Sequence, residues 1–126
     1  MKLRIKGNSL RLRVSPSEVT RLLETGRIEE TIHFAPDPDA RLTYALEHKP
    51  QTTAMTVRYT PQRVTVVVSS SAALQWANGR EVGLYGETGT DSGTLDLAVE
   101  KDFACLDKSD AENIDTFAHP KQGAIC

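Results

Sequence analysis

The sequence predicts an α+β domain with eight strands and two short helices, arranged as two ββαββ units. Three observations lead to this prediction: apolar and polar residues alternate with period two, a serine-led helix start occurs twice, and the order of these signals repeats. We expect the strands to form one mostly antiparallel curved sheet or a barrel. The units are expected at 1–50 and 51–106 of a single domain (1–106), with an acidic tail (107–126) packed on it.

The first hairpin is predicted in residues 2–14. Leu3 and Ile5 lie between basic residues, Gly7-Asn8-Ser9 forms a turn, and leucine then alternates with arginine as far as Val14. Period two places the apolar side chains on one face of a strand and the cations on the other. The hairpin should therefore present one apolar and one basic face.

Both helices are predicted from their first residues. The run Ser15-Pro16-Ser17-Glu18 combines a capping serine, a proline at the first helical position and a glutamate that completes a capping box. Gly26 should end this helix in the left-handed conformation. Ser69-Ser70-Ser71 can cap the second helix, which carries Trp76 and ends at Asn78-Gly79.

The same alternation predicts the remaining strands. They are expected at 28–34 and 42–47 after the first helix, at 55–59 and 64–68 before the second helix, and at 82–84 and 95–99 after it. Val14, Ser15 and Leu22 match Val68, Ser69 and Trp76, in each case 54 positions further on. We interpret this pattern as an ancient duplication; the alternative is chance recurrence in an antiparallel α+β domain.

The composition is that of one globular domain. The chain has 126 residues, of which 39% are hydrophobic and 25% charged, and a net charge of -2, which gives no general attraction to nucleic acid or an anionic membrane. No apolar run approaches the roughly 18 residues of a membrane span. Charges interrupt the N-terminal stretch, so it does not read as a secretion signal. We therefore expect a cytoplasmic protein that does not contact a membrane.

Cations recur on the polar faces of two predicted hairpins. The candidate ligand-binding residues are Lys2, Arg4, Lys6, Arg11 and Arg13 in the first hairpin, and Arg58 and Arg63 in its counterpart. Such side chains hold phosphate or carboxylate groups. The alternative is a solvated face whose charges pair across strands, each pair contributing about 0.2–1 kcal/mol. We do not expect nucleic acid as partner, because aromatic side chains for stacking do not alternate with these cations.

The tail contains three soft candidate metal ligands, Cys105, His119 and Cys126. None of them has the close spacing that identifies a zinc site. Three interpretations stay open: structural thiols, a divalent metal such as zinc, and a Cys105–Cys126 disulfide. We favour structural thiols and predict no cofactor.

The sequence contains neither an evident nucleophile–base pair nor a glycine loop in the context of a phosphate site. We therefore expect a small non-enzymatic binding domain that contacts an unknown protein or a small anionic ligand through the basic sheet face or the tail. The alternative is a metal- or phosphate-dependent hydrolase whose polar faces line a barrel-like channel.

Several stretches resemble a family of small, uncharacterised bacterial proteins. They are KGNSLRLRVSPSEV, LLETGRIEETIHF, LTYALE, QWANGREVGLYGE and LAVEKDFACLD, of which EKDFACL is the most specific. The resemblance covers most of residues 2–107 and, more loosely, the tail. It implies a bacterial, single-domain, cytoplasmic protein and supplies no catalytic residues.

Overall fold

The computed structural model describes residues 1–103 and 115–118. The order of elements is ββαββ twice. Their bounds are β1 Lys2–Lys6, β2 Ser9–Val14, α1 Pro16–Thr25, β3 Arg27–His33, β4 Arg41–Lys49, β5 Thr56–Thr60, β6 Arg63–Ser69, α2 Ser70–Asn78, β7 Gly83–Thr90 and β8 Gly93–Lys101. The predicted α+β class and element order are confirmed.

The strands form two sheets rather than one. Sheet A has the order β1-β2-β8-β7 and sheet B the order β3-β4-β6-β5. The central pairs, β2 with β8 and β4 with β6, are parallel, and all other neighbours are antiparallel. The reason is that α1 carries the chain from sheet A to sheet B, and α2 carries it back. Each sheet therefore combines a hairpin from either half, and the described strands do not close into a barrel.

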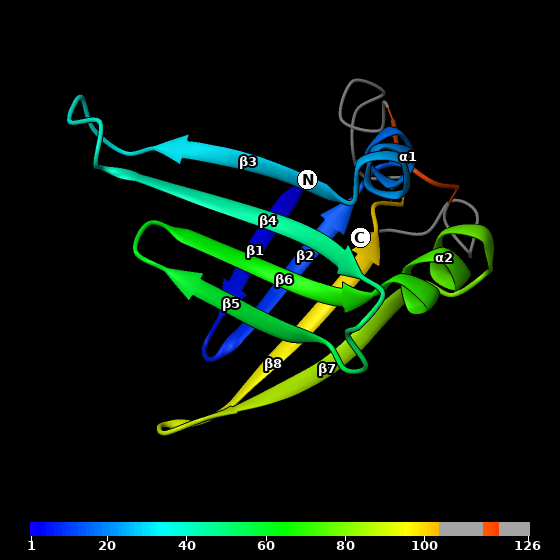
Figure 1. Ribbon diagram of the computed structural model, residues 1–126. Coiled ribbons are helices and arrows are strands. Elements are labelled where there is room, and N and C mark those ends of the chain that lie inside the picture. The colour runs from blue at the N-terminus through cyan, green and yellow to red at the C-terminus, as the bar shows by residue number, and fades with distance from the viewer. Residues whose placement is uncertain (104–114, 119–126) are drawn as a thin grey trace.

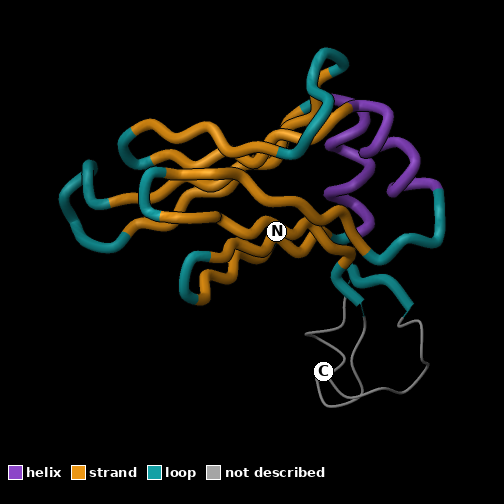
Figure 2. Tube along the Cα trace, turned by 90° about the horizontal axis from the view of Figure 1, so that it is seen from below, coloured by secondary structure: helices purple, strands orange, loops and turns teal. Residues whose placement is uncertain are grey.

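The two sheets lie as two layers with both helices at one end (Figures 1 and 2). Their apolar sides face each other and the helices, so the core lies between the layers and beneath α1 and α2. Leu22 of α1 and Trp76 of α2, which the sequence places in corresponding positions, are both fully buried there. No helix in the described part of the chain is long and apolar enough to span a membrane.

The core fills only one end of the space between the layers. Leu12 of β2 is 1% exposed, whereas Ile5 on the same side of β1 is 64% exposed. Tyr59 of β5, which pairs with the inner residue Val64, is also largely exposed. Figure 1 shows the reason: the sheets cross at an angle, and their hairpin tips diverge away from the helices. Alternation thus predicts correctly which side chains lie on the inner side of each sheet, but not which of them are buried.

The helix starts follow the sequence prediction. Ser15 caps α1 in a full capping box with Glu18, and Gly26 ends the helix with φ of 82°. Ser69 caps α2, whose Ala72 N–H donates to the serine oxygen. The end of α2 differs, because Gly79 is extended rather than left-handed.

A cationic or imidazole side chain from a neighbouring strand binds a carbonyl at the end of each helix. His48 Nε2 of β4 donates to the Leu22 oxygen (3.1 Å), and its Nδ1 lies 2.8 Å from the Ser70 hydroxyl. Lys101 at the end of β8 is buried and donates to the Gly79 oxygen (2.9 Å). The Lys101 contact satisfies a carbonyl at the end of α2, whereas the Leu22 oxygen accepts the Gly26 N–H in addition to the His48 ring.

The uneven core predicts different costs for two truncations in the first hairpin. Leu12→Ala should lower the free energy of unfolding by about 2–5 kcal/mol, because it removes a fully buried side chain. Ile5→Ala is the matched control and should change it by less than about 0.5 kcal/mol. Urea unfolding of both variants checks this. Equal losses would show that the hairpin tips are covered.

Candidate functional site

The first hairpin presents one continuous basic surface, called here the basic face. Its members are Lys2, Arg4, Lys6, Arg11 and Arg13 on the outer side of sheet A. Lys2 lies opposite Arg13, and Arg4 opposite Arg11, so their side chains share one side of the antiparallel pair. Arg58 and Arg63 lie in sheet B. The seven predicted cations therefore do not form one surface, because α1 moves the chain to the other layer before β5 and β6 form.

Two of the five cations of the basic face are held in ion pairs. Arg11 Nε lies 3.0 Å from Glu100 Oε1 on β8. Lys2 Nζ lies 2.9 Å from the buried carboxylate of Asp102. Arg4, Lys6 and Arg13 have no ion pair among the contacts of the described residues. Cross-strand pairing of charges, the alternative interpretation of this face, thus accounts for only part of it.

Across β8 the outer side of sheet A becomes acidic. Asp96 and Glu100 of β8 lie beside Glu87 and Tyr85 of β7. The Tyr85 hydroxyl donates to Glu100 Oε2 (2.7 Å). Partial desolvation, and then this hydrogen bond, raise the pKa of Tyr85 to about 12, because both disfavour the phenolate next to Glu100. Glu100 is thereby fixed between a phenol and the Arg11 guanidinium.

The basic face continues into a polar pocket of about 330 Å³ at the start of α1, called here the α1 pocket. Its cationic lining residues are Lys2, Arg13 and Arg21, and its other lining residues are Met1, Ser15, Ser17, Glu18, Asp102 and Asp115. Lys2 and Arg13 belong to both the basic face and the α1 pocket. An anionic group that crosses the basic face would therefore reach the pocket.

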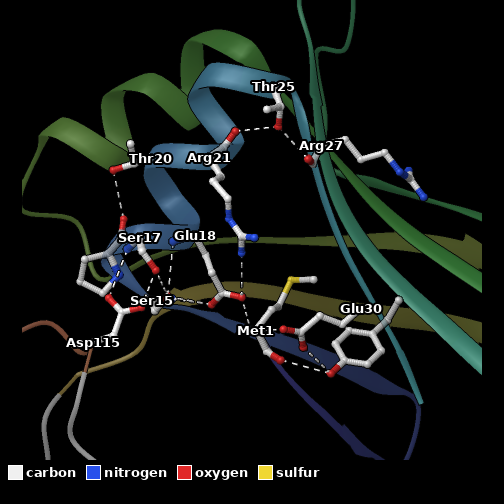
Figure 3. A network of polar contacts seen from close by, with 12 residues as sticks. Met1, Ser15, Ser17, Glu18, Thr20, Arg21, Thr25, Arg27, Glu30 and Asp115 are labelled. Carbon is white, nitrogen blue, oxygen red and sulfur yellow. Dashed lines mark hydrogen bonds and ion pairs between the residues drawn. The ribbon is translucent and has the colours of Figure 1, made fainter. Parts of the chain in front are cut away.

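A carboxylate of the chain itself already lies in the α1 pocket. Asp115 accepts hydrogen bonds from the Ser17 backbone N–H (3.3 Å, to Oδ1) and from the Ser17 hydroxyl (to Oδ2), as Figure 3 shows. These bonds lower the pKa of Asp115, with Arg21 adding a smaller attraction. The two residues lie 98 positions apart in sequence. The α1 pocket thus binds a carboxylate group, that of Asp115.

Glu18 forms the inner wall of the α1 pocket. Its Oε1 accepts from the Ser15 backbone N–H (3.0 Å) and hydroxyl (2.9 Å), and its Oε2 pairs with the Met1 amino group. Arg21 lies 3.8 Å from the same oxygen. Figure 3 shows Ser15, Glu18 and Met1 converging beneath α1. Burial alone would raise the pKa of Glu18, but the bonds from the amino group and Ser15 outweigh it, so the pKa is lowered.

The outer side of sheet B is more completely paired. Glu47 of β4 lies within ion-pair distance of Arg58 (3.0 Å), Arg27 (3.7 Å) and Lys49 (3.8 Å). Arg58 therefore has a partner that Arg4, its counterpart in the first half, lacks among the described contacts. Arg27 Nη2 is a buried nitrogen without a hydrogen-bond partner in the described structure.

The metal prediction lies outside the described residues, because Cys105, His119 and Cys126 all fall in the parts that the structure does not describe. Within residues 1–103 and 115–118, no group of three or more His, Cys, Asp or Glu side chains could hold a metal ion. The charged channel expected of a hydrolase needs polar faces directed inward. In the described part of the chain the apolar faces are inside and the charges outside.

Sequence reasoning missed three members of the α1 pocket. From the sequence, Ser17 is assigned only to the helix start, and Arg21 has no predicted role. Asp115 could not be connected with either, because its contact with Ser17 spans most of the chain. The local signal that was present is the serine pair Ser15 and Ser17 beside two cationic strands.

The comparisons with known proteins identify a family but no activity. The model of a family of unknown function, DUF7009, matches residues 1–121 of this chain. No curated protein and no solved structure matches it.

The lowered pKa of Glu18 predicts how stability responds to acid. Its ionised form is favoured by folding, so this contribution is complete above the unfolded value near 4.5 and is lost as pH falls through the lower folded pKa. Glu18→Gln keeps the hydrogen-bonding shape and removes the charge. It should therefore flatten the decline of the unfolding free energy below about pH 5.

Urea unfolding between neutral and acidic pH measures this effect. Glu24→Gln, at an exposed position on the same helix, is the control and should leave the decline unchanged. If both variants show the wild-type decline, Glu18 is not the carboxylate responsible.

Proposed function

Because the chain belongs to DUF7009, a family described only as of unknown function, we propose a function from its own geometry. It is a small non-enzymatic binding domain whose basic face holds an acidic segment of a partner protein. The observation that carries this proposal is the set of three cations, Arg4, Lys6 and Arg13, that share one face without ion pairs among the described residues.

The length of the basic face favours an extended ligand. Lys2 and Lys6 are four residues apart on β1, which corresponds to roughly 13 Å along a strand. A single small anion reaches only part of such a row, whereas carboxylates repeated along a polypeptide reach all of it. Several cations acting together also bind more strongly than the isolated surface pairs whose contributions are small.

The chemistry of the α1 pocket supports carboxylate as the group that is bound. Asp115 accepts two hydrogen bonds from Ser17 in a pocket that Lys2 and Arg13 also line. An acidic side chain of a partner can pair with Arg13, which has no ion pair among the described contacts and lies at the end of the basic face. Nucleic acid is disfavoured, because the one exposed aromatic residue on this side, Tyr85, is bonded to Glu100 on the acidic half of the sheet.

We also propose that the two halves derive from one duplicated unit. The element order and the two sheet orders support this, since each strand of sheet A has a counterpart in sheet B. The basic face is then a specialisation of the first half. Its counterpart on β5 and β6 carries only Arg58 and Arg63, and Arg58 is paired with Glu47.

The proposal predicts that an oligo-aspartate peptide binds the domain and that added salt weakens the complex. The double variant Arg4→Glu, Lys6→Glu should weaken binding by about tenfold, because two attractions become repulsions. Isothermal titration calorimetry at two salt concentrations measures both effects.

Arg63→Glu is the control, because it reverses an exposed charge on the other sheet and should leave the affinity nearly unchanged. An equal loss in this variant would mean that net charge alone drives binding. Tighter binding of a single-stranded oligonucleotide of the same length would overturn the choice of a protein partner.

A further inference from the structure

The starts of the two helices are surrounded by corresponding elements in the two halves of the chain, although the Met1 amino group, which pairs with Glu18 and Glu30, has no counterpart at Met55. Each helix begins at a capping serine. Beside this serine lie the start of a hairpin in one sheet and an edge strand of the other sheet: β1 and β3 at α1, and β5 and β7 at α2. The corresponding residues, first half then second, are Met1 and Met55, Ser15 and Ser69, Glu18 and Ala72, and Glu30 and Gly86. The comparison of these pairs shows which side chains lie in the space beside the helix start in each half.

In the first half, carboxylates of the chain fill that space. Glu18 accepts both the backbone N–H and the hydroxyl of Ser15. Glu30 lies 3.2 Å from the Met1 amino group and accepts from the Tyr44 hydroxyl (2.9 Å). Two carboxylates of the chain are thus bound at the start of α1, next to the α1 pocket.

In the second half both carboxylates are missing. Ala72 and Gly86 replace the two glutamates, and a cavity of about 350 Å³ remains, called here the α2 cavity. Its walls include Met55, Val68 and Leu84. Gly86 allows Met55 to pack directly against β7, because a Cβ at its position would lie only 3.1 Å from the Met55 Cβ.

Among the polar residues that line the α2 cavity, Ser69 is the counterpart of the serine that binds Glu18 in the first half. The Ser69 hydroxyl accepts from the Ala72 N–H (3.1 Å) and otherwise lies 3.4 Å from the Ser71 hydroxyl. The equivalent Ser15 hydroxyl accepts from the Glu18 N–H and donates its proton to the Glu18 carboxylate. Among the described contacts, no carboxylate accepts a hydrogen bond from the Ser69 hydroxyl.

We propose that the α2 cavity binds a small monocarboxylic acid with an apolar body. The carboxylate takes the place that the Glu18 carboxylate has in the first half and accepts from Ser69, and the apolar body lies against Met55, Val68 and Leu84. The volume is at the lower end of the roughly 300–1,000 Å³ of small-molecule sites, which limits the ligand to a short chain or one ring. This site is separate from the basic face and does not depend on the function proposed for it.

Hexanoate, hexanol and hexylammonium are matched probes for this proposal. We expect hexanoate to raise the melting temperature in a concentration-dependent manner and to shift the backbone amide resonances of Ser69 and Ala72. Hexanol should bind at least about tenfold more weakly, because it lacks the charged acceptor. Glu87 also lines the cavity, so tighter binding of hexylammonium would overturn the assignment of the ligand as an acid.

Ala72→Glu tests the site from the protein side. The new side chain should complete a capping box with Ser69 and fill the cavity, so we expect a higher melting temperature and loss of hexanoate binding. Ala72→Leu fills the space without a carboxylate and should also abolish binding. Gln75→Glu adds the same charge to an exposed position of α2 and should bind hexanoate like the wild type.

Two outcomes of these experiments would contradict the proposal. Unchanged hexanoate binding in Ala72→Glu and Ala72→Leu would place the ligand elsewhere. Absence of any response of the wild type to hexanoate would leave the α2 cavity as a solvent-filled gap.

Discussion

The parallel pairing of β2 with β8 and of β4 with β6 is the constraint on which the rest of the structure depends. Each pair joins strands from different halves, so neither half completes a sheet of its own. The pairing brings Glu100 beside the basic hairpin, where Arg11 reaches it. It also brings the start of β5 beside β7, so that Met55 lies against Gly86. The Arg11–Glu100 ion pair and the close approach of Met55 to Gly86 are both products of this exchange between halves.

The two helix starts differ in whether a carboxylate of the chain is bound there. Backbone N–H groups in the first turn have no partner within the helix, so a nearby anion is favourable. At α1 the chain supplies two anions, Glu18 from the helix itself and Asp115 from a distant segment. At α2 it supplies neither in the described structure, and small residues leave space instead. Corresponding helix starts therefore differ in this molecule: carboxylates of the chain are bound at the start of α1, and none is bound at the start of α2 in the described structure.

The sequence was sufficient for local structure because local structure depends on neighbouring residues. The alternation in the first hairpin and the Ser15–Glu18 capping box were both predicted and are present. Alternation says which side of a strand is apolar but not which strand lies next to it, so the parallel pairs and the second sheet were not foreseen. For the same reason Arg58 was grouped with the basic hairpin, although it lies on the other layer. Buried Lys101 shows a further limit of sequence-based prediction, since its partner is the Gly79 carbonyl at the end of α2, which alternation along β8 does not indicate.

The wide separation of the paired strands has a consequence for how the chain acquires its structure. Asn8 and Thr94, which meet where β2 adjoins β8, are 86 positions apart. Contacts of such long range require a large loop to close before they contribute any stability, and domains with high contact order fold slowly. During synthesis the first hairpin emerges before β8, so its apolar side lacks this neighbour until residues 93–101 have been made. The nascent protein therefore passes through a stage at which the first seven strands exist while β2 still exposes a surface that will become part of the core.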